Sequence, residues 1–242
     1  MDLTIVAASA MQHDAARLQG VAQNLGNALT PGYKKQLAIS GGFAAQFQAA
    51  AAGGQARAGA GIASPVRMLL DPSAGTLRST GIPTDVAIDG EGYFELASPT
   101  GSLYTRRGAL RLDAAGRLVG PQDLPLMGLG GEIVLGGEPF TIGANGDIVQ
   151  NGATVARLRV VRFEQPELLE PVGAGSYAQG GAVPELAGAA RLRVGYEENS
   201  NVDSAREMVA LTETMRHFEA MQKVVQGYDE LLEKSIRKLG EF

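Results

Sequence analysis

The sequence predicts an α+β protein with a long helix near each end and a central, mostly antiparallel β region. Two observations predict the helices: apolar residues recur every three or four positions near the C-terminus and every seven positions near the N-terminus. A third observation predicts the middle, where short β-prone segments alternate with turn-forming pairs such as Asn145-Gly146 and Asn151-Gly152.

The C-terminal helix is expected over about residues 202–239, after capping side chains at Asn201, Asp203 and Ser204. Its apolar or small residues alternate in steps of three and four, close to the 3.5-residue repeat of a supercoiled helix pair. They are Ala205, Met208, Leu211, Met215, Phe218, Met221, Val225, Tyr228, Leu232, Ser235 and Leu239. Such a helix is far longer than the roughly 12 residues of an average one, and its charged residues exclude a membrane span.

The N-terminal helix is expected over residues 1–29, with smaller side chains on its apolar face. Met11, Leu18 and Leu25 recur every seven residues, and Ala15, Ala22 and Leu29 follow four positions after each. Pro31 and Gly32 then end the helix. Periodicity alone leaves two alternatives open: each helix packs on its own globular core, or the helices serve pairing or assembly.

The central region, about residues 66–196, reads as short strands typical of a compact all-β domain. The expected strands are 66–70, 85–88, 93–97, 103–106, 110–113, 117–119, 132–135, 140–142, 148–150, 157–163 and 191–196. Residues 33–39 are expected to be extended. The Ala/Gly-rich stretch 49–64 fits a flexible linker or a solvated surface loop.

Composition argues against several function classes. The 242 residues carry a net charge of −5 without a basic patch interleaved with aromatics, which argues against a nucleic-acid partner. There is no cysteine for thiolate chemistry. His13 and His217 lack neighbours at metal-ligand spacing and are read as helix-surface or interface residues. We therefore expect no catalytic site, no metal and no cofactor.

Targeting signals are also missing from the sequence. The first residues lack the positive charge of a secretory leader, and there is no run of 18 apolar residues. We expect a protein without a cleavable signal peptide and without a membrane span.

Four stretches resemble the bacterial flagellar basal-body rod and hook proteins. They are 24–35 (NLGNALTPGYKK), 75–94 (GTLRSTGIPTDVAIDGEGYF), 104–119 with its Tyr-Thr-Arg start and Gly-Arg-Leu-Val end, and 198–203 (ENSNVD). The residues that carry the resemblance are Asn24, Asn27, Gly32, Tyr33, Asp85, Gly90, Gly92, Tyr104, Arg106, Ser200, Asn201 and Val202. Two positions depart from the family pattern: Gly26 stands where alanine is usual, and Arg107 replaces an acidic residue or asparagine.

The resemblance implies a structural subunit rather than an enzyme. The length and the stretch 216–221 (RHFEAM) look most like the proximal rod members, with the distal rod members as the near alternative. The implied partners are other rod proteins, copies of the same chain, the flagellar type III export apparatus and rod-surrounding ring proteins. The implied location is the periplasmic rod of the basal body. A competing hypothesis is a glycan-binding or enzymatic β module with helical dimerisation arms.

The resemblance also implies a layout. A coiled-coil inner domain would be formed by residues 1–30 and 200–242, and an outer β domain by residues 76–184. A connecting segment between the two would be formed by residues 31–75 and 185–199. The expected assembly interface comprises Met11, Leu18, Leu25, Met208, Leu211, Met215, Phe218, Val225 and Leu232. We expect both ends to order only when they dock on neighbouring subunits.

Overall fold

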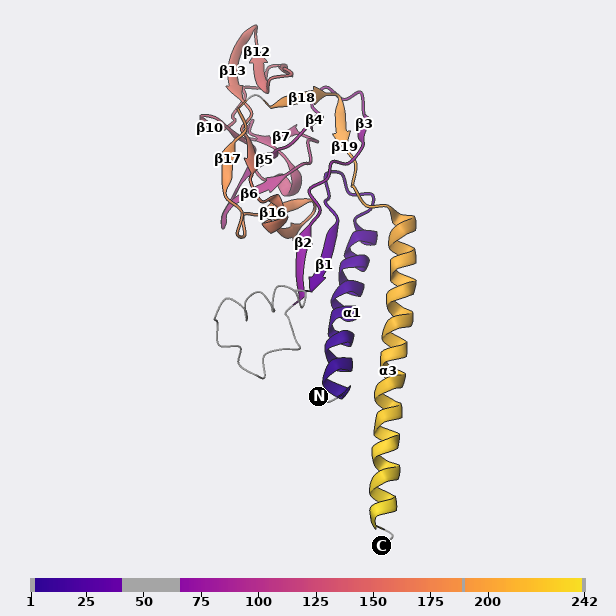
Figure 1. The fold of residues 1–242 in the computed structure, drawn as a ribbon. Coiled ribbons are helices and arrows are strands. Elements are labelled where there is room, and N and C mark those ends of the chain that lie inside the picture. The colour runs from indigo at the N-terminus through magenta and orange to yellow at the C-terminus, as the bar shows by residue number, and fades with distance from the viewer. Residues whose placement is uncertain (1–2, 41–65, 189, 241–242) are drawn as a thin grey trace. The chain divides into compact units, whose positions relative to one another are not determined.

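The computed structural model describes residues 3–40, 66–188 and 190–240. They form an α+β protein with a helix near each end and mostly antiparallel strands between (Figure 1). The chain divides into two compact units. The helical unit contains both helices and the first strand pair, and the β unit contains residues 26–35 and 70–203. The three-part division expected from the sequence stays a prediction.

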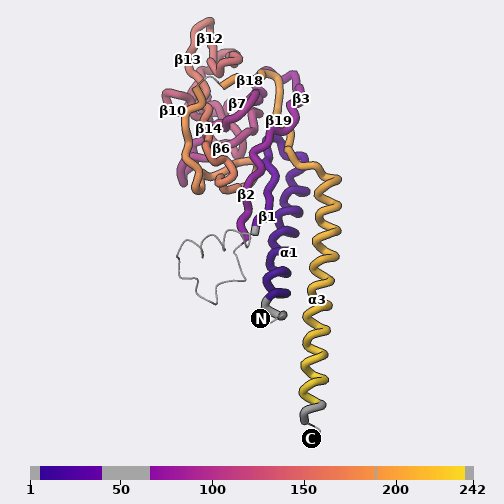
Figure 2. The backbone as a smooth tube through the Cα atoms, viewed as in Figure 1, coloured from indigo at the N-terminus to yellow at the C-terminus, as the bar shows by residue number. Residues whose placement is uncertain are grey.

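The helical unit confirms both predicted helices. Helix α1 spans Leu3–Gly26 and helix α3 spans Ser204–Gly240, each continuous in the backbone trace of Figure 2. Strands β1 (Gln36–Ser40) and β2 (Val66–Leu70) pair with each other, so the strand predicted over 66–70 is confirmed. The Ala/Gly-rich stretch 49–64 lies outside the described residues.

The β unit is built from many short strands and two short 3₁₀ turns. The strands are β3 (Leu77–Ser79), β4 (Val86–Asp89), β5 (Tyr93–Ser98), β6 (Gly101–Thr105), β7 (Arg111–Leu112), β8 (Leu118–Val119), β9 (Met127–Gly128), β10 (Gly131–Glu132), β11 (Phe140–Ile142), β12 (Asp147–Gln150), β13 (Ala153–Arg157), β14 (Val160–Phe163), β15 (Glu170–Gly173), β16 (Ser176–Ala178), β17 (Pro184–Leu186), β18 (Arg191–Val194) and β19 (Tyr196–Glu198). The 3₁₀ turns are η1 (Pro121–Asp123) and η2 (Pro166–Leu168).

The largest sheet has the order β15-β16-β6-β5-β14-β17. Because side chains alternate across a strand, this sheet separates two apolar cores. On β5, Phe94 and Leu96 enter one core while Tyr93 enters the other. Val160 and Val161 on β14 divide in the same way.

The end of the β unit returns to its beginning. Strand β18 pairs antiparallel with β4, with Leu192 opposite Ile88. Strand β19 pairs antiparallel with β3, with Glu198 opposite Leu77. These two pairs bring the residues just before α3 next to the first strands of the β unit.

The structure corrects part of the strand prediction. The single strand expected over 157–163 is wrong, because β13 ends at Arg157 and β14 begins at Val160. The turn at Asn151-Gly152 is confirmed as the β12–β13 connection, and both residues have the positive φ that a type I′ turn requires.

The strand expected over 191–196 is two strands, because β18 ends at Val194 and β19 begins at Tyr196, and the strand expected over 132–135 ends at Glu132 as part of β10. Strands β3, β9 and β15 to β17 were not expected, because each spans at most four residues and so carries little periodic signal.

Candidate functional site: a buried charge network and the terminal helices

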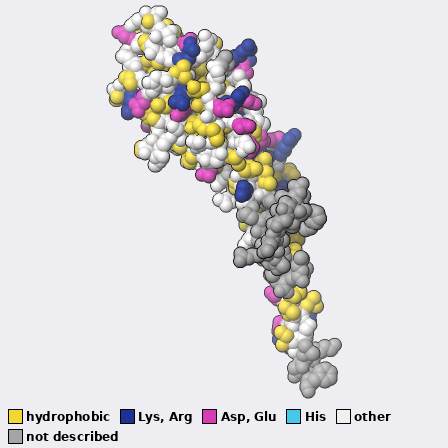
Figure 3. All heavy atoms as spheres, turned by 60° about the vertical axis from the view of Figure 1, so that its left-hand side comes forward, with side chains coloured by type: hydrophobic (Ala, Val, Ile, Leu, Met, Phe, Trp, Pro, Cys, Tyr) yellow, Lys and Arg dark blue, Asp and Glu magenta, His cyan; other side chains and the backbone are white. Residues whose placement is uncertain are grey.

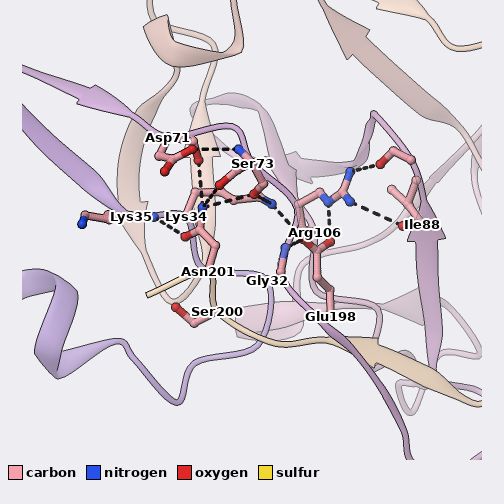
Figure 4. A network of polar contacts seen from close by, with 12 residues as sticks. Gly32, Lys34, Lys35, Asp71, Ser73, Ile88, Arg106, Glu198, Ser200 and Asn201 are labelled. Atoms are coloured by element: carbon pink, nitrogen blue, oxygen red, sulfur yellow. Dashed lines mark hydrogen bonds and ion pairs between the residues drawn. The ribbon is translucent and has the colours of Figure 1, made fainter. Parts of the chain in front are cut away.

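A buried ion-pair network lies in the β unit and centres on Glu198, the last residue of β19. One carboxylate oxygen, Oε1, is 2.7 Å from Nζ of Lys34, and the other, Oε2, is 2.6 Å from Nε of Arg106. All three side chains are at most 4% exposed. The backbone amide of Gly75 also donates to Oε1 at 2.8 Å, so both carboxylate oxygens have partners. Figure 4 shows Glu198 beside Arg106.

The electrostatics of the network favour the charged carboxylate. Burial pushes the pKa of Glu198 upward, but Arg106 and Lys34 together outweigh burial and hold this pKa below its ordinary value. Burial lowers the pKa of Lys34, although Glu198 opposes that shift. Removing one member of such a network would leave an uncompensated buried charge.

Arg106 also fixes a turn of the β unit. Its Nη1 donates to the carbonyls of Gly90 at 2.8 Å and Gly92 at 2.7 Å. Gly92 has φ +138° and its Cβ position lies 2.7 Å from a methyl of Val160, so only glycine fits there. The guanidinium therefore binds the Gly90–Gly92 turn through two carbonyls. Figure 4 shows its further contact with the carbonyl of Ile88.

Asn201 fastens two further segments of the β unit (Figure 4). Its Oδ1 accepts from the amide of Lys35 at 2.7 Å, and its Nδ2 donates to the carbonyls of Asp71 and Ser73 at 3.1 Å. Lys34 Nζ donates to the same Ser73 carbonyl at 2.6 Å. These side chains, together with the backbone bond from the Asp71 amide to the Lys35 carbonyl at 2.8 Å, tie together segments from three distant parts of the sequence.

Residues 32–34 are anchored through their backbone. The amide of Gly32 donates to the carbonyl of Glu198 at 2.7 Å, and the amide of Lys34 donates to the Tyr177 hydroxyl at 2.7 Å. Burial raises the pKa of Tyr177 well above its ordinary value, so this hydroxyl stays neutral. Gly32 has φ +67°, which favours glycine at this turn.

A second polar site lies in the helical unit at Asn24, which is 1% exposed. The Asn24 side chain accepts from the amide of Gln36 at 2.8 Å and donates to the Gln36 carbonyl at 2.9 Å, as a neighbouring strand would. It also donates to Oε2 of Glu207 at 3.0 Å. One amide therefore joins α1, β1 and α3.

Two side-chain contacts set the relation between α1 and α3. Asn24 meets Glu207, and Oδ2 of Asp14 lies 2.6 Å from Nδ1 of His217. Ten residues separate the two contact positions on each helix, so α1 and α3 run antiparallel in one register. On this register Leu3 is level with Tyr228, and residues 229–240 of α3 continue past the first described residue of α1.

The structure places the expected interface residues in two groups. Met11, Leu18, Leu25, Leu211, Phe218 and Val225 are half-buried. Met208, Met215 and Leu232 are exposed by 60%, 49% and 46%. In Figure 3 hydrophobic side chains are visible on the surface of the C-terminal part of α3, where Leu231 and Ile236 are also exposed. Whether these residues form an assembly interface stays a prediction.

The residues that carried the sequence resemblance are mostly buried. Asn24, Gly32, Tyr33, Asp85, Gly92, Tyr104 and Arg106 are buried, Asn27, Ser200, Asn201 and Val202 are half-buried, and Gly90 is exposed. For Asn24, Gly32, Gly92, Arg106 and Asn201, the contacts of the two polar sites explain why these residue types stand there. Arg107, a departure from the family pattern, donates to the carbonyl of Ala174 at 3.2 Å.

Sequence reasoning missed five functional partners. Lys34 and Glu198 were quoted only as parts of motifs, and Asp14, Glu207 and the contact of His217 were not foreseen. The available signal was a charged residue on an apolar face, such as Asp14 and Glu207, each at most 5% exposed. Within the described residues there is no cluster of three potential metal ligands, and neither described helix is apolar enough to cross a membrane.

Comparison with known proteins points to one family. The family described as flagellar basal body rod FlgEFG protein C-terminal matches residues 193–238, and the flagellar hook protein FlgE/F/G D1 domain matches residues 87–155. The chain is 30% identical over 247 residues to the flagellar basal-body rod protein FlgF of Salmonella typhimurium, covering 95% of each chain. It is 30% identical over 254 residues to FlgG of Borreliella burgdorferi, covering 93% of this chain and 94% of that protein. It is 27% identical to FlgG of Bacillus subtilis over 256 residues, covering 94% and 95%.

Proposed function

The chain belongs to the flagellar basal-body rod protein family, and from this premise we propose that it is the proximal, FlgF-type subunit of the rod. It is a structural subunit of the basal-body rod. In our proposal it has no enzymatic role. It leaves the cell through the flagellar type III export apparatus and takes its place in the periplasmic part of the rod.

One observation carries the assembly mechanism: α3 pairs with α1 through Asn24–Glu207 and Asp14–His217, yet still exposes Met208 and Met215. We propose that the two helices act as a coiled-coil inner domain made from residues 1–30 and 200–242. The exposed methionines then pack on the helices of a neighbouring subunit. A contact between different surfaces, repeated without closing into a ring, builds a helical tube.

The remaining parts have proposed roles in the same assembly. Residues 31–75 and 185–199 connect the inner domain to the outer β domain. The buried network of Glu198 makes this connection rigid enough to transmit torque from motor to hook. Residues 76–184 form the outer β domain. Other rod proteins and further copies of the chain are the proposed neighbours, and ring proteins around the rod are proposed contacts of the outer domain.

The distal, FlgG-type rod subunit is the second candidate. It is favoured by the FlgG relatives, which match over 94% and 93% of the chain, close to the 95% matched by the FlgF relative from Salmonella typhimurium. Expression of this chain in strains that lack either FlgF or FlgG separates the two: restored motility in the strain lacking FlgF supports the proximal assignment. Restoration only in the strain lacking FlgG would assign the chain to the distal rod.

Substitution of Met215 by aspartate tests the assembly mechanism. We expect Met215→Asp to abolish motility and incorporation into isolated basal bodies, because assembly would bury an unpaired charge. Ala220→Asp is the matched control, since Ala220 is also exposed on α3 but is not one of the expected interface residues. Normal motility of the Met215→Asp variant would refute the proposed interface. A titrating catalytic site in the folded protein would instead support the enzyme hypothesis.

A further inference from the structure

The β unit contains a cavity of about 770 Å³ beside the buried network. Its walls are the segments 72–74 and 90–92, Arg106, Glu164 and Pro166, together with residues of β5, β14 and β17. Tyr93 and Phe163 lie among the residues that line it. This volume is in the range of sites that enclose a ligand of several atoms rather than a single ion.

Side-chain hydrogen bonds hold two of the cavity walls, the segments 90–92 and 72–74, in place. Arg106 donates to the carbonyls of Gly90 and Gly92, and Asn201 donates to both the carbonyl and the hydroxyl of Ser73. The cavity is therefore formed before any ligand arrives, and a preformed site loses little conformational entropy on binding.

The cavity is acidic. Glu91 and Glu164 line it, and neither carboxylate forms an ion pair with a described residue. Glu185 lies 3.6 Å from Arg162, with both side chains more than half exposed. The positive charge of Arg106, the other cation of the lining, is already paired with Glu198, so the free charge in the lining is negative.

Tyr93 adds a polar group without a partner. The residue is 4% exposed, it lines the cavity, and its hydroxyl makes no hydrogen bond with the described residues. Burial raises the pKa of Tyr93 to about 12, so the hydroxyl is neutral and can accept a hydrogen bond from a cation. The Tyr93 oxygen is not among the buried side-chain atoms that lack a partner, so it is accessible to solvent and can be reached by a ligand.

The geometry disfavours a sugar ring as the ligand. Sugar recognition by aromatics needs an open ring face, but Phe163 and Tyr177 pack edge-on against Tyr93 with centroids at 5.6 and 6.1 Å. The guanidinium of Arg106 lies 5.8 Å from the centroid of the same ring. The hydroxyl and the two carboxylates are left to contact a ligand.

We propose that this cavity is a receptor site for a basic side chain, arginine or lysine, presented by a neighbouring protein subunit. The head group binds Glu91 and Glu164 and donates to the Tyr93 hydroxyl, while the aliphatic stem packs on the apolar lining. That the side chain comes from a neighbouring subunit rests on the proposed rod function. The preference of the site for a basic group is independent of that function.

Titration of the purified full-length chain with Nα-acetyl-arginine amide, followed by NMR, tests this proposal without requiring rod assembly. We expect shifts of the Gly90 and Gly92 amides. The neutral isostere Nα-acetyl-citrulline amide should bind at least about tenfold more weakly than the arginine probe, because it lacks charge-assisted hydrogen bonds. The double variant Glu91→Gln/Glu164→Gln should lose the response, and the exposed matched control Glu132→Gln/Glu138→Gln should keep it.

Three outcomes would overturn the proposal. The first is the absence of shifts with the arginine probe in the wild-type chain, and the second is equal binding of arginine and citrulline. The third is a response to N-acetylglucosamine with none to arginine, which would make the cavity a glycan site. Failure of this test leaves the rod assignment standing, because that assignment is tested by motility and incorporation.

Discussion

Oε2 of Glu198 lies 2.6 Å from Nε of Arg106, and neither side chain is more than 4% exposed. Burying such a pair carries a large desolvation cost that the attraction offsets only when the remaining polar atoms are also bound. Here Lys34 and the amide of Gly75 donate hydrogen bonds to the Glu198 carboxylate. The carbonyls of Gly90 and Gly92 accept hydrogen bonds from the Arg106 guanidinium. The pair therefore fixes the segment before α3 against the middle of the β unit.

Glu198→Gln should lower the free energy of unfolding of the β unit by about 3–5 kcal/mol, because it leaves Lys34 and Arg106 buried without a counter-charge. Urea unfolding followed by circular dichroism at neutral pH measures the change. The neighbouring Glu197→Gln is a matched control. Glu197 pairs at 3.1 Å with Arg78, whose side chain is 59% exposed, so its loss should cost at most about 1 kcal/mol. Equal small effects of the two substitutions would show that the network does not stabilise the fold.

The same carboxylate predicts how stability depends on pH. The folded pKa of Glu198 is held below its ordinary value of 4.5 by Arg106 and Lys34, against burial. Its contribution is therefore complete above that ordinary value and is lost as the pH falls through the lowered folded pKa. The stability difference between wild type and Glu198→Gln should shrink from about pH 5 downward. Parallel unfolding curves across that range, with an unchanged difference, would contradict this.

Sequence reasoning predicted the elements that have a local signal. The helices α1 and α3 follow from apolar spacing, and their ends differ from the expected bounds by at most three residues. The turn at Asn151-Gly152 follows from its residue types. Each of these features is decided by residues close together in the sequence, where periodicity and turn preference act.

The polar sites could not be predicted in the same way, because their partners are far apart in the sequence. Lys34 and Glu198 are 164 residues apart, and Asp14 and His217 are 203 apart. No spacing rule links such residues, since only the fold brings them together, through the backbone bond of Gly32 to Glu198 and through the α1–α3 register. The family resemblance marked Asn24, Arg106 and Asn201, but it did not say what they bind.

Asn24→Asp should loosen the helical unit. The substitution keeps the shape of the side chain but places a second buried carboxylate beside Glu207 and removes the donor to the Gln36 carbonyl. We expect a loss of about 2–4 kcal/mol in the stability of that unit at neutral pH, measured by hydrogen exchange at α1 amides. The control Gln19→Glu adds the same charge at an exposed position of α1. If both variants exchange like the wild type, Asn24 does not hold the three elements together.

Limited trypsin digestion of the free subunit should remove the end of α3 first. Residues 229–240 continue past the first described residue of α1, and Lys234 and Arg237 are exposed there, so this part of the helix opens at low free-energy cost. Mass spectrometry should detect loss of these residues before cleavage at Lys223, which lies in the part of α3 paired with α1. Longer digestion should leave a fragment close to residues 31–200, and the same sites should be protected in isolated rods. A free chain that resists cleavage at both ends would mean that its helices need no neighbouring subunit.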